Sequence, residues 1–507
     1  LTRKQLVLPD DSAYRFQHIL IRDSVYEGLL KRARATLHER FVEWGDRVNG
    51  DRAVEFEEIS GYHLEQAHRN LIELGIIDEH ALAVGAEAAR RLGSAGRRAF
   101  VRGDMSAAAN LLLRATGPLP PQSRQRLALF PDLGEALMQL GEFEQAESLL
   151  EDAVATAELA GERALAANAR LVRLFVQLLA GETEDWTEQA TRAAEEAILL
   201  CEAEGDEVGL ARAWRLSAWN SLNASRFEAS AASLGRAIEH ARRAGDVRQE
   251  RRASTQYAAA AVYGPMPVDE CIAGCEEIAA RVAGDRQAEA AVNCVLGQLE
   301  AMRGRFEPAR ELCRRALAMF EELGLVVDAA TVALSAGQVE LLAGDALAAE
   351  TALRRGYEYF ARVGERYLQS SLAGLLAEAV FVQGRWDDAE RLARDTEELA
   401  AADDVDAQML WRLQQARVSA VRGQVVDAER LAREALELLE PTDNVVSQIA
   451  ALATLAQVLR LTGNGQEADE RLARARELAE AKGSSIVLEQ VPGLVDMPAS
   501  PGTAMMP

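Results

Sequence analysis

The sequence predicts an all-α protein, a right-handed α-solenoid in which helix–turn–helix units recur about every 40 residues. The first observation is compositional: Ala and Leu carry the apolar content, aromatic residues make up 5% of the chain, and only 13 prolines interrupt 507 residues. Such a mixture favours helices over strands. The second observation is a pair of regularly spaced glycine series. The third is a small residue that returns at one place in each unit, so a repeat array explains the length better than several unrelated domains.

One glycine series marks the turn between the two helices of each unit. The segments "LGEFEQAESLLEDAVATAELAG" (140–161), "RGRFEPARELCRRALAMFEELG" (303–324) and "RGQVVDAERLAREALELLE" (422–440) share one pattern. A Gly opens the turn, a large apolar residue follows two positions on, and a small residue comes three positions later. Ser225 fills the same slot in one unit, and the unit at Gly181 is about four residues longer. The turn glycines are Gly103, Gly141, Gly264, Gly304, Gly344, Gly384, Gly423 and Gly463.

A second glycine series closes the second helix of each unit. A helix that ends with a positive φ favours Gly there, because Gly has no Cβ. The sequence therefore predicts a chain of helix, short turn, helix and Gly-containing turn. The members of this series are Gly161, Gly205, Gly245, Gly284, Gly324 and Gly364.

Small residues are expected where the paired helices approach closely. Gly134 and Gly297 provide one on the first helix, seven positions before the turn Gly. On the second helix the small residues are Ala146, Ala309, Ala349, Ala389, Ala428 and Ala468. This pattern resembles the tetratricopeptide repeat, over about ten units. The period exceeds the usual 34 residues of that repeat and the terminal Pro is missing, so the resemblance implies a concave binding face without identifying the residues that line it.

Charge and apolar patterning exclude several classes of partner. The formal charge is −24, with 80 acidic and 56 basic residues, which disfavours direct binding to nucleic acid or to an anionic membrane surface. No apolar run approaches the ~20 residues of a membrane span, and no signal segment precedes the array. We expect a cytoplasmic protein. The first residue is Leu, so we also expect a piece of a longer polypeptide.

No catalytic or metal-binding pattern is found. Cys271 and Cys275 lie four apart on a predicted helix, but if Val268 takes the large apolar slot after a two-residue insertion they fall on packing positions. His63 and His68 are five apart, which does not place them on one helix face as a zinc pair requires. Nucleotide loops, hydrolase elbows and calcium loops are missing. The chain is therefore predicted to be non-enzymatic, without a catalytic residue, a metal or a cofactor of its own.

Two groups of residues are candidates for binding. Aromatic residues in the middle of the array, Trp214, Trp219, Tyr257 and Tyr263, are candidates to line a groove that binds a protein or peptide. The runs "RRLGSAGRR" (90–98) and "ARRAGDVRQERR" (241–252) could hold an anion, although most such runs are solvated faces paired with Glu and Asp. The anion-binding candidates in the first run are Arg90, Arg91, Arg97 and Arg98.

The opening stretch "YRFQHILIRDSVYEGLLKRARATLHERF" (14–41) alternates as a strand and then becomes helical. Together with "GYHLEQAHRNLIELG" (61–75) and "GRRAFVRGDMSAAANLLLRAT" (96–116), it resembles the C-terminal region of bacterial adenylate/guanylate cyclase domain-containing proteins, in which a cyclase domain and an AAA-type ATPase precede a repeat array. The matching positions are Phe16, His18, Leu20, Arg22, Asp23, Tyr26, Leu37, His38, Glu39 and Arg40. The resemblance implies that the stretch ends a winged-helix segment, that His18, Arg22, Asp23 and Tyr26 signal to a nucleotide site, and that ATP and Mg²⁺ belong only to a module upstream.

These observations give a domain plan and a leading hypothesis. Residues 1–80 are predicted to be a winged-helix remnant and linker, residues 81–483 the repeat superhelix, and residues 484–507 a disordered tail. The leading hypothesis is a non-catalytic sensor and scaffold that binds a protein, peptide or small effector and regulates an upstream ATPase, and possibly cyclase, module. One alternative is part of an active cyclase or ATPase. Another is a region of a transcription regulator of the LuxR-like large ATPase type.

Overall fold

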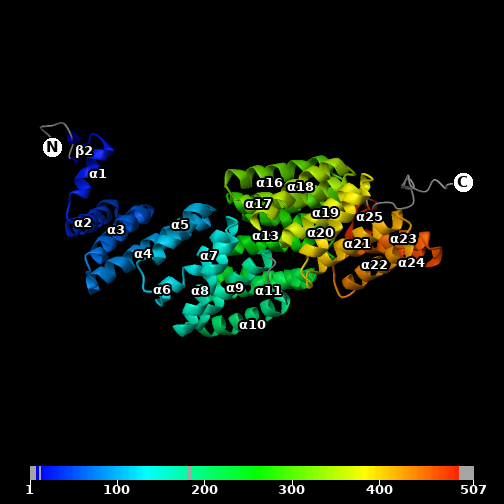
Figure 1. Ribbon diagram of the computed structural model, residues 1–507, viewed down its shortest axis with the longest axis horizontal. Coiled ribbons are helices and arrows are strands. Elements are labelled where there is room, and N and C mark those ends of the chain that lie inside the picture. The colour runs from blue at the N-terminus through cyan, green and yellow to red at the C-terminus, as the bar shows by residue number, and fades with distance from the viewer. Residues whose placement is uncertain (1–6, 11–12, 181–184, 490, 492–507) are drawn as a thin grey trace. The chain divides into compact units, whose positions relative to one another are not determined.

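The computed structural model describes residues 7–10, 13–180, 185–489 and 491 (Figure 1). Within these residues the chain forms helices in successive packed pairs, as predicted. Contacts divide it into two compact units. Unit 1 comprises residues 1–100 with 106–133, and unit 2 comprises residues 101–105 with 134–507. This division does not test the predicted boundary at residue 80, which stays a prediction.

Unit 1 opens with a short antiparallel hairpin in which Val7 lies opposite Phe16. The strand that ends at Phe16 leads into a helix, as the opening stretch predicts, whereas the winged-helix assignment stays a prediction. Leu64, Leu71 and Val84 belong to the buried core of this unit. Residues 7–10 and 13–139 form the first elements, and the last of them, α7, continues into unit 2 from residue 134. They are β1 (Val7–Asp10), β2 (Ala13–Phe16), α1 (Ile19–Glu27), α2 (Lys31–Asn49), the 3-10 helix η2 (Gly50–Phe56), α3 (Glu57–Glu73), α4 (Glu79–Val101), α5 (Met105–Thr116), α6 (Arg124–Leu127) and α7 (Phe130–Gln139).

Unit 2 holds the regular part of the array. Each first helix packs on the second helix of its own repeat and on the first helix of the next repeat. The first helices are α9 (Arg163–Ala180), α11 (Glu207–Asn223), α13 (Val247–Tyr263), α15 (Arg286–Met302), α17 (Val326–Leu342), α19 (Tyr367–Val382), α21 (Val405–Val421) and α23 (Val445–Leu461). The second helices are α8 (Phe143–Leu159), α10 (Trp186–Glu204), α12 (Phe227–Ala244), α14 (Val268–Arg281), α16 (Phe306–Glu322), α18 (Ala346–Val363), α20 (Trp386–Leu399), α22 (Val425–Leu439) and α24 (Gly465–Lys482), followed by α25 (Ser485–Glu489).

The glycine pattern is confirmed at nearly every position that the structure describes. All members of the closing series have positive φ, and so does Ser225, with a φ of 52° in the turn slot. In the longer unit Gly181 lies outside the described residues, and Asp185 takes the positive φ at 56°. Gly264 differs: its φ is −72° with an extended ψ, because the chain continues through Pro265 and Pro267 before α14 begins. That start, at Val268, confirms the two-residue insertion.

The predicted small residues lie where helices touch. All six predicted alanines of the second helices have no exposed surface. A Cβ added to Gly134 would lie 2.8 Å from a methyl carbon of Leu150, and one added to Gly297 would lie 3.0 Å from Cys313 Sγ. Gly337, which occupies the same place on α17, is closer still, at 2.3 Å from Leu353. A larger residue at these positions would separate the two helices of a pair.

Unit 2 also contains contacts that an open solenoid lacks. In an open array each repeat touches only its neighbours. Here the backbone N–H of Thr187 donates to Asp403, 216 positions away, at 2.8 Å. The N–H groups of Phe227 and Glu228 likewise donate to Asp443 at 2.5 and 2.7 Å. Unit 2 therefore coils until segments about five repeats apart touch.

Lys482 makes the most buried of these contacts. It has no exposed surface, and its Nζ donates to the carbonyl oxygens of Ala261, Gly264 and Met266 at 3.0, 2.7 and 2.8 Å. Burial lowers the pKa of Lys482. The irregular turn leaves these carbonyl groups at and after the end of α13 without a helical N–H donor, and the lysine supplies a donor instead.

The prediction of a disordered tail from residue 484 is wrong for its first residues. Ser484 is buried and its hydroxyl donates to the Met302 carbonyl at 2.7 Å, and the helix α25 follows. These residues are ordered because they pack on α15 and α23. Residues 490 and 492–507 lie outside the described part of the chain. No helix among the described residues has the length and apolar character needed to span a membrane.

Candidate functional site

An exposed apolar surface lies on α2 and continues onto α3. Leu37, Phe41, Trp44 and Val48 follow the spacing i, i+4, i+7, i+11, which places them on one side of α2. Their exposed fractions are 51, 38, 52 and 61%. Tyr62, at 45% exposure, extends the surface onto α3. We call these five residues the apolar face.

The apolar face lies beside, not on, the packing side of α2. The residues that α2 buries are Ala35, His38, Val42 and Gly45. His38, Val42 and Gly45 each come one position after a member of the apolar face, about 100° around the helix. Because α2 already has its own packing side, the second apolar side is available to a partner.

A chain of hydrogen bonds holds α1, α2 and α3 together beside this face. The Tyr26 hydroxyl lies 2.8 Å from His38 Nε2, and His38 Nδ1 lies 2.7 Å from His63 Nδ1. Neutral tautomers satisfy both bonds when Tyr26 donates to His38 and His38 donates to His63. Burial, and secondarily the nearby His63, lower the pKa of His38 to about 4. Phe41 packs on His63 with ring centroids 4.1 Å apart, which connects the chain of hydrogen bonds to the apolar face.

The other residues predicted to signal to a nucleotide lie on the surface of the same segment. His18 is exposed, and its Nδ1 accepts the backbone N–H of Leu20 at 3.1 Å, so it caps the N-terminus of α1. Arg22 pairs with Asp23 at 2.7 Å, and both side chains are about half exposed. The structure thus places these residues and Tyr26 on one short helix, and their role toward a nucleotide stays a prediction.

The first predicted anion-binding run is paired within unit 1. Arg91 binds Asp46 and Glu87, each at 2.7 Å. Hydrogen bonds from Arg90 and Arg91 lower the pKa of Glu87 to about 2. The remaining pairs are Arg90 with Glu87 and Glu57, Arg97 with Asp132, and Arg98 with Glu57. An external anion would have to displace these carboxylates, and an anion site here stays a prediction.

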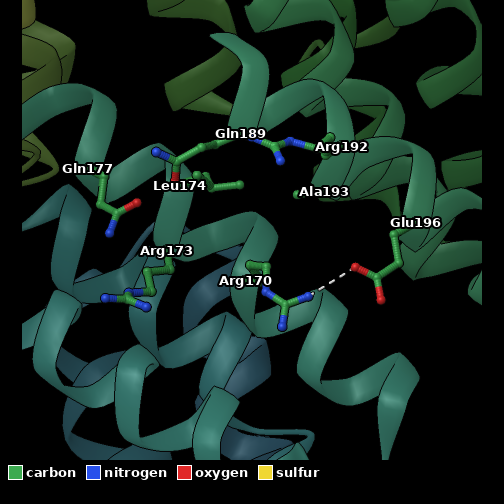
Figure 2. A pocket seen from close by; sticks show the side chains of 8 residues that line it. All are labelled: Arg170, Arg173, Leu174, Gln177, Gln189, Arg192, Ala193 and Glu196. Carbon is green, nitrogen blue, oxygen red and sulfur yellow. Dashed lines mark hydrogen bonds and ion pairs between the residues drawn. The ribbon is translucent and has the colours of Figure 1, made fainter. Parts of the chain in front are cut away.

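A pocket of about 560 Å³ opens between α9 and α10 of unit 2 (Figure 2). Arg170 bridges its two walls, because it pairs with Glu196 on α10 at 3.2 Å and also binds Glu158. Two carboxamides and three guanidinium groups supply polar contacts around an apolar patch. The lining residues are Arg170, Arg173, Leu174, Gln177, Gln189, Arg192, Ala193 and Glu196.

The structure divides the four predicted groove aromatics between packing and a second pocket. Trp219 lies between Phe175 and Tyr367, with ring centroids 6.1 Å from each. Arg236 covers the Trp214 ring at 4.3 Å. Both tryptophans are half-buried and pack within unit 2.

The two predicted tyrosines lie on α13, and Tyr263 is its last residue before the irregular turn. Tyr257 lines a pocket of about 320 Å³ together with Phe227, Gly264 and Met266. Tyr263 instead stacks on Phe227 at 5.5 Å and donates its hydroxyl to Gln338 at 3.0 Å. Of the four aromatics, only Tyr257 contributes to the wall of a described pocket, and ligand binding there stays a prediction.

A polar position repeats inside unit 2 and is not among the residues predicted from the sequence. It is the residue directly after the small residue of the first helix, and its occupants bond to neighbouring first helices. Glu378 accepts from Gln414 and Arg417 at 3.1 and 2.8 Å, and Arg417 donates onward to Thr454 at 3.2 Å. A count of residue types one place after each small residue would have found it. The occupants are Glu135, Gln298, Gln338, Glu378, Arg417 and Gln457.

The cysteines lie at packing positions. Cys271 and Cys275 are 2 and 1% exposed and belong to a hydrophobic cluster, as the packing interpretation predicts. Burial raises the pKa of Cys275 to about 12, so it remains a thiol. Across the described residues no group of three or more His, Cys, Asp or Glu side chains is arranged to hold a metal ion.

Comparisons with known proteins agree with the repeat architecture. The family model described as tetratricopeptide repeat matches residues 132–160. No curated protein matches the sequence. The Cut9–Hcn1 hetero-tetramer of the APC/C matches with a TM-score of 0.50 and 14% identity over 92% of this chain and 90% of the other. A Rap protein in complex with the competence and sporulation factor matches with a TM-score of 0.50 and 12% identity over 73% of this chain and 100% of the other.

These similarities establish a fold and no more. The chain is a tetratricopeptide-like repeat array, an architecture suited to protein–protein interaction.

Proposed function

We propose that this chain is a non-catalytic sensor and scaffold whose apolar face docks an upstream nucleotide-binding module and whose repeat unit binds a protein or peptide. The observation that carries the proposal is the apolar face itself. Four large apolar side chains in helical register on α2, each at least 38% exposed, are unusual on a free surface. Large aromatic residues are also the ones that dominate binding energy at interfaces.

The position of the apolar face in the sequence favours the upstream module as its partner. Leu37 and Phe41 of the face lie within the stretch 14–41, which resembles the end of the ATPase-linked segment in cyclase domain-containing proteins, and Trp44 and Val48 follow it directly. ATP and Mg²⁺ would belong to that module and not to this chain. Arg22 and Asp23 lie on α1 and His18 caps its N-terminus, immediately before the face, where a docked module would meet them.

The pocket between α9 and α10 is the proposed binding surface of unit 2. Gln177 and Gln189 each carry an amide donor and acceptor, which matches the hydrogen-bonding groups of an extended peptide backbone. Arg192 is exposed and pairs only weakly with Glu188, at 3.2 Å, so it can exchange its partner for a carboxylate of a ligand. A protein or peptide that occupies this pocket could bias the module by shifting the first repeats.

The parent polypeptide provides the test of the docking proposal. The variant Phe41→Glu/Trp44→Glu should change the ATP affinity or hydrolysis rate of the parent by about tenfold or more, because burying two carboxylates at an interface is unfavourable. Leu199→Glu is the matched control, since Leu199 is 69% exposed on α10 of unit 2. Equal activity of the two variants, or an upstream reading frame without an ATPase, would contradict the proposal.

The rival function is catalytic. If the chain were part of an active cyclase or ATPase, a point substitution within it would abolish turnover without loss of nucleotide or module binding. Measuring hydrolysis and cyclisation by the isolated chain separates the two functions, because the scaffold proposal predicts no turnover.

A further inference from the structure

Four arginines surround one buried carboxylate inside unit 2. Glu135 has no exposed surface and lies on α7, directly after the close-contact residue Gly134. Its carboxylate oxygens lie 3.1 Å from Arg215, 2.7 Å from Arg252, 3.2 Å from Arg248 and 3.6 Å from Arg212. Arg212 and Arg215 come from α11, and Arg248 and Arg252 from α13. We call these four residues and Glu135 the buried arginine cluster.

Arg215 is the most buried arginine of the cluster, and some of its N–H donors are not hydrogen-bonded. Its side chain is 1% exposed, and only Nη2 reaches Glu135. Its Nε and Nη1 atoms are buried without a hydrogen-bond partner. The Phe175 ring covers one face of the guanidinium, with its centroid 4.5 Å from Cζ, but supplies no acceptor oxygen. Leaving several N–H groups of a buried cation unbonded is costly, so an acceptor is expected at this place.

The surrounding charge indicates that the acceptor is negative. Burial and the neighbouring cations Arg252, Arg248 and Arg212 together lower the pKa of Arg215 to about 9, although Glu135 raises it. Arg248 and Arg252 also act on the carboxylate of Asp328, on α17. Asp328 already accepts from Gln287 at 2.9 Å, and burial raises its pKa. A neutral water molecule would satisfy N–H groups there but would not offset the repulsion among the guanidinium groups.

We propose that the buried arginine cluster binds a small oxyanion of the phosphate class beside Glu135. Guanidinium groups bind such oxygens in pairs, and a dianion offers acceptors to more than one arginine at once. Arg252 is the most exposed of the four, at 19%, so a small ion can enter on its side. A peptide or nucleic acid chain cannot reach Arg215, because that side chain is almost fully enclosed. This inference does not depend on the proposed function.

The test is a titration of the full chain with inorganic phosphate. Calorimetric binding and thermal unfolding would be measured in phosphate and in chloride at equal ionic strength, with sulfate as a second oxyanion. The proposal predicts that one phosphate binds per chain and raises the unfolding temperature above that in chloride. Hydrogen exchange should slow in α11 and α13 when phosphate is bound.

Neighbouring arginines provide a matched pair of variants. Arg252→Gln should weaken phosphate binding by about tenfold, because it removes a charge-assisted donor. Arg251→Gln should leave it unchanged, since Arg251 pairs with Asp285 at 2.9 Å. Glu135→Gln should strengthen phosphate binding, since it removes the competing negative charge.

The outcomes decide the proposal. If the wild-type chain unfolds at the same temperature in phosphate and in chloride and shows no binding heat, the proposal is overturned. It is also overturned if Arg252→Gln and Arg251→Gln bind phosphate equally well. Because Arg252 is partly exposed, its substitution is expected to leave the fold intact even if variants of Arg215 do not fold.

Discussion

Arg215 Nη2 lies 3.1 Å from Glu135 Oε1, although the two residues are 80 positions apart, and neither side chain is more than 1% exposed. The pair joins α7 to α11 across the intervening repeat, so the interior of unit 2 at this place is ionic and not purely apolar. The charges hold particular helices in register, and the free energy of unfolding should depend strongly on the single carboxylate.

Glu135→Gln should therefore destabilise unit 2 by about 3–5 kcal/mol, because it leaves buried guanidinium groups without their carboxylate. The measurement is urea unfolding in chloride buffer, followed by helical circular dichroism. Glu188→Gln is the control, since Glu188 makes an exposed pair with Arg192 that contributes at most about 1 kcal/mol. Similar free energies of unfolding for the two variants would show that the cluster does not stabilise the fold.

A glycine on α17 tests the close approach of paired helices. Gly337→Ala should destabilise by about 1–3 kcal/mol, because the added Cβ would lie 2.3 Å from Leu353. Gly274→Ala on α14 should be neutral or slightly stabilising, since nothing lies within 4 Å of a Cβ there. Thermal unfolding of both variants measures the difference, and a stable Gly337→Ala variant would argue against this helix packing.

Lys482 tests the contacts between distant repeats. Lys482→Met keeps the length of the side chain but removes the ammonium donor from the carbonyl groups of Ala261, Gly264 and Met266. The Cys271 thiol, a weak donor, still reaches Ala261 and Met266, whereas Gly264 loses the contact. We expect a loss of about 2–4 kcal/mol and faster hydrogen exchange at the end of α13. Lys31→Met, which removes an exposed pair with Glu73 at 3.0 Å, should cost less than about 1 kcal/mol. No change in exchange near Gly264 would count against the contact.

Two buried groups predict opposite pH dependences. Burial raises the pKa of Glu365 to about 8, so the native state binds a proton that the unfolded state has lost, and stability from this group falls as pH rises from 4.5 to about 8. The pKa of His38 is lowered to about 4, so its contribution to stability falls as pH drops from 6.5 to about 4. Urea unfolding between pH 4 and 8 should show a flatter profile above pH 4.5 for Glu365→Gln. An unchanged slope would contradict the protonation assigned to Glu365.

Local features of the fold were predictable from the sequence because they depend on the backbone conformation or the helix spacing at single residues. Positive φ at Ser225 follows from its place in the glycine series, and the burial of Ala309 follows from helix spacing. The contact of Lys482 with Gly264 could not be predicted, since it depends on the coiling of the whole unit. The spacing of Phe41 and Trp44 is visible in the sequence, but only the packing of α2 shows that this side remains exposed.

The binding residues were harder to predict for the same reason. Trp219 is aromatic and lies in the expected repeat, yet its ring packs between Phe175 and Tyr367. Arg248 and Arg252 belong to a run that resembles a solvated face, and only the return of α13 toward α7 places them around Glu135. Sequence spacing establishes which residues share a helix face, whereas the neighbours of that face come from distant repeats.

The most direct test of the proposed docking is photo-crosslinking from position 44 in the parent polypeptide. A benzoylphenylalanine in place of Trp44 on the apolar face should react with the upstream nucleotide-binding module, and the crosslinked peptides are identified by mass spectrometry. The same probe at Leu199 should not react with that module. The scaffold proposal would be contradicted if the probe at position 44 formed no crosslink to the module. It would also be contradicted if the probes at positions 44 and 199 crosslinked to the module equally well.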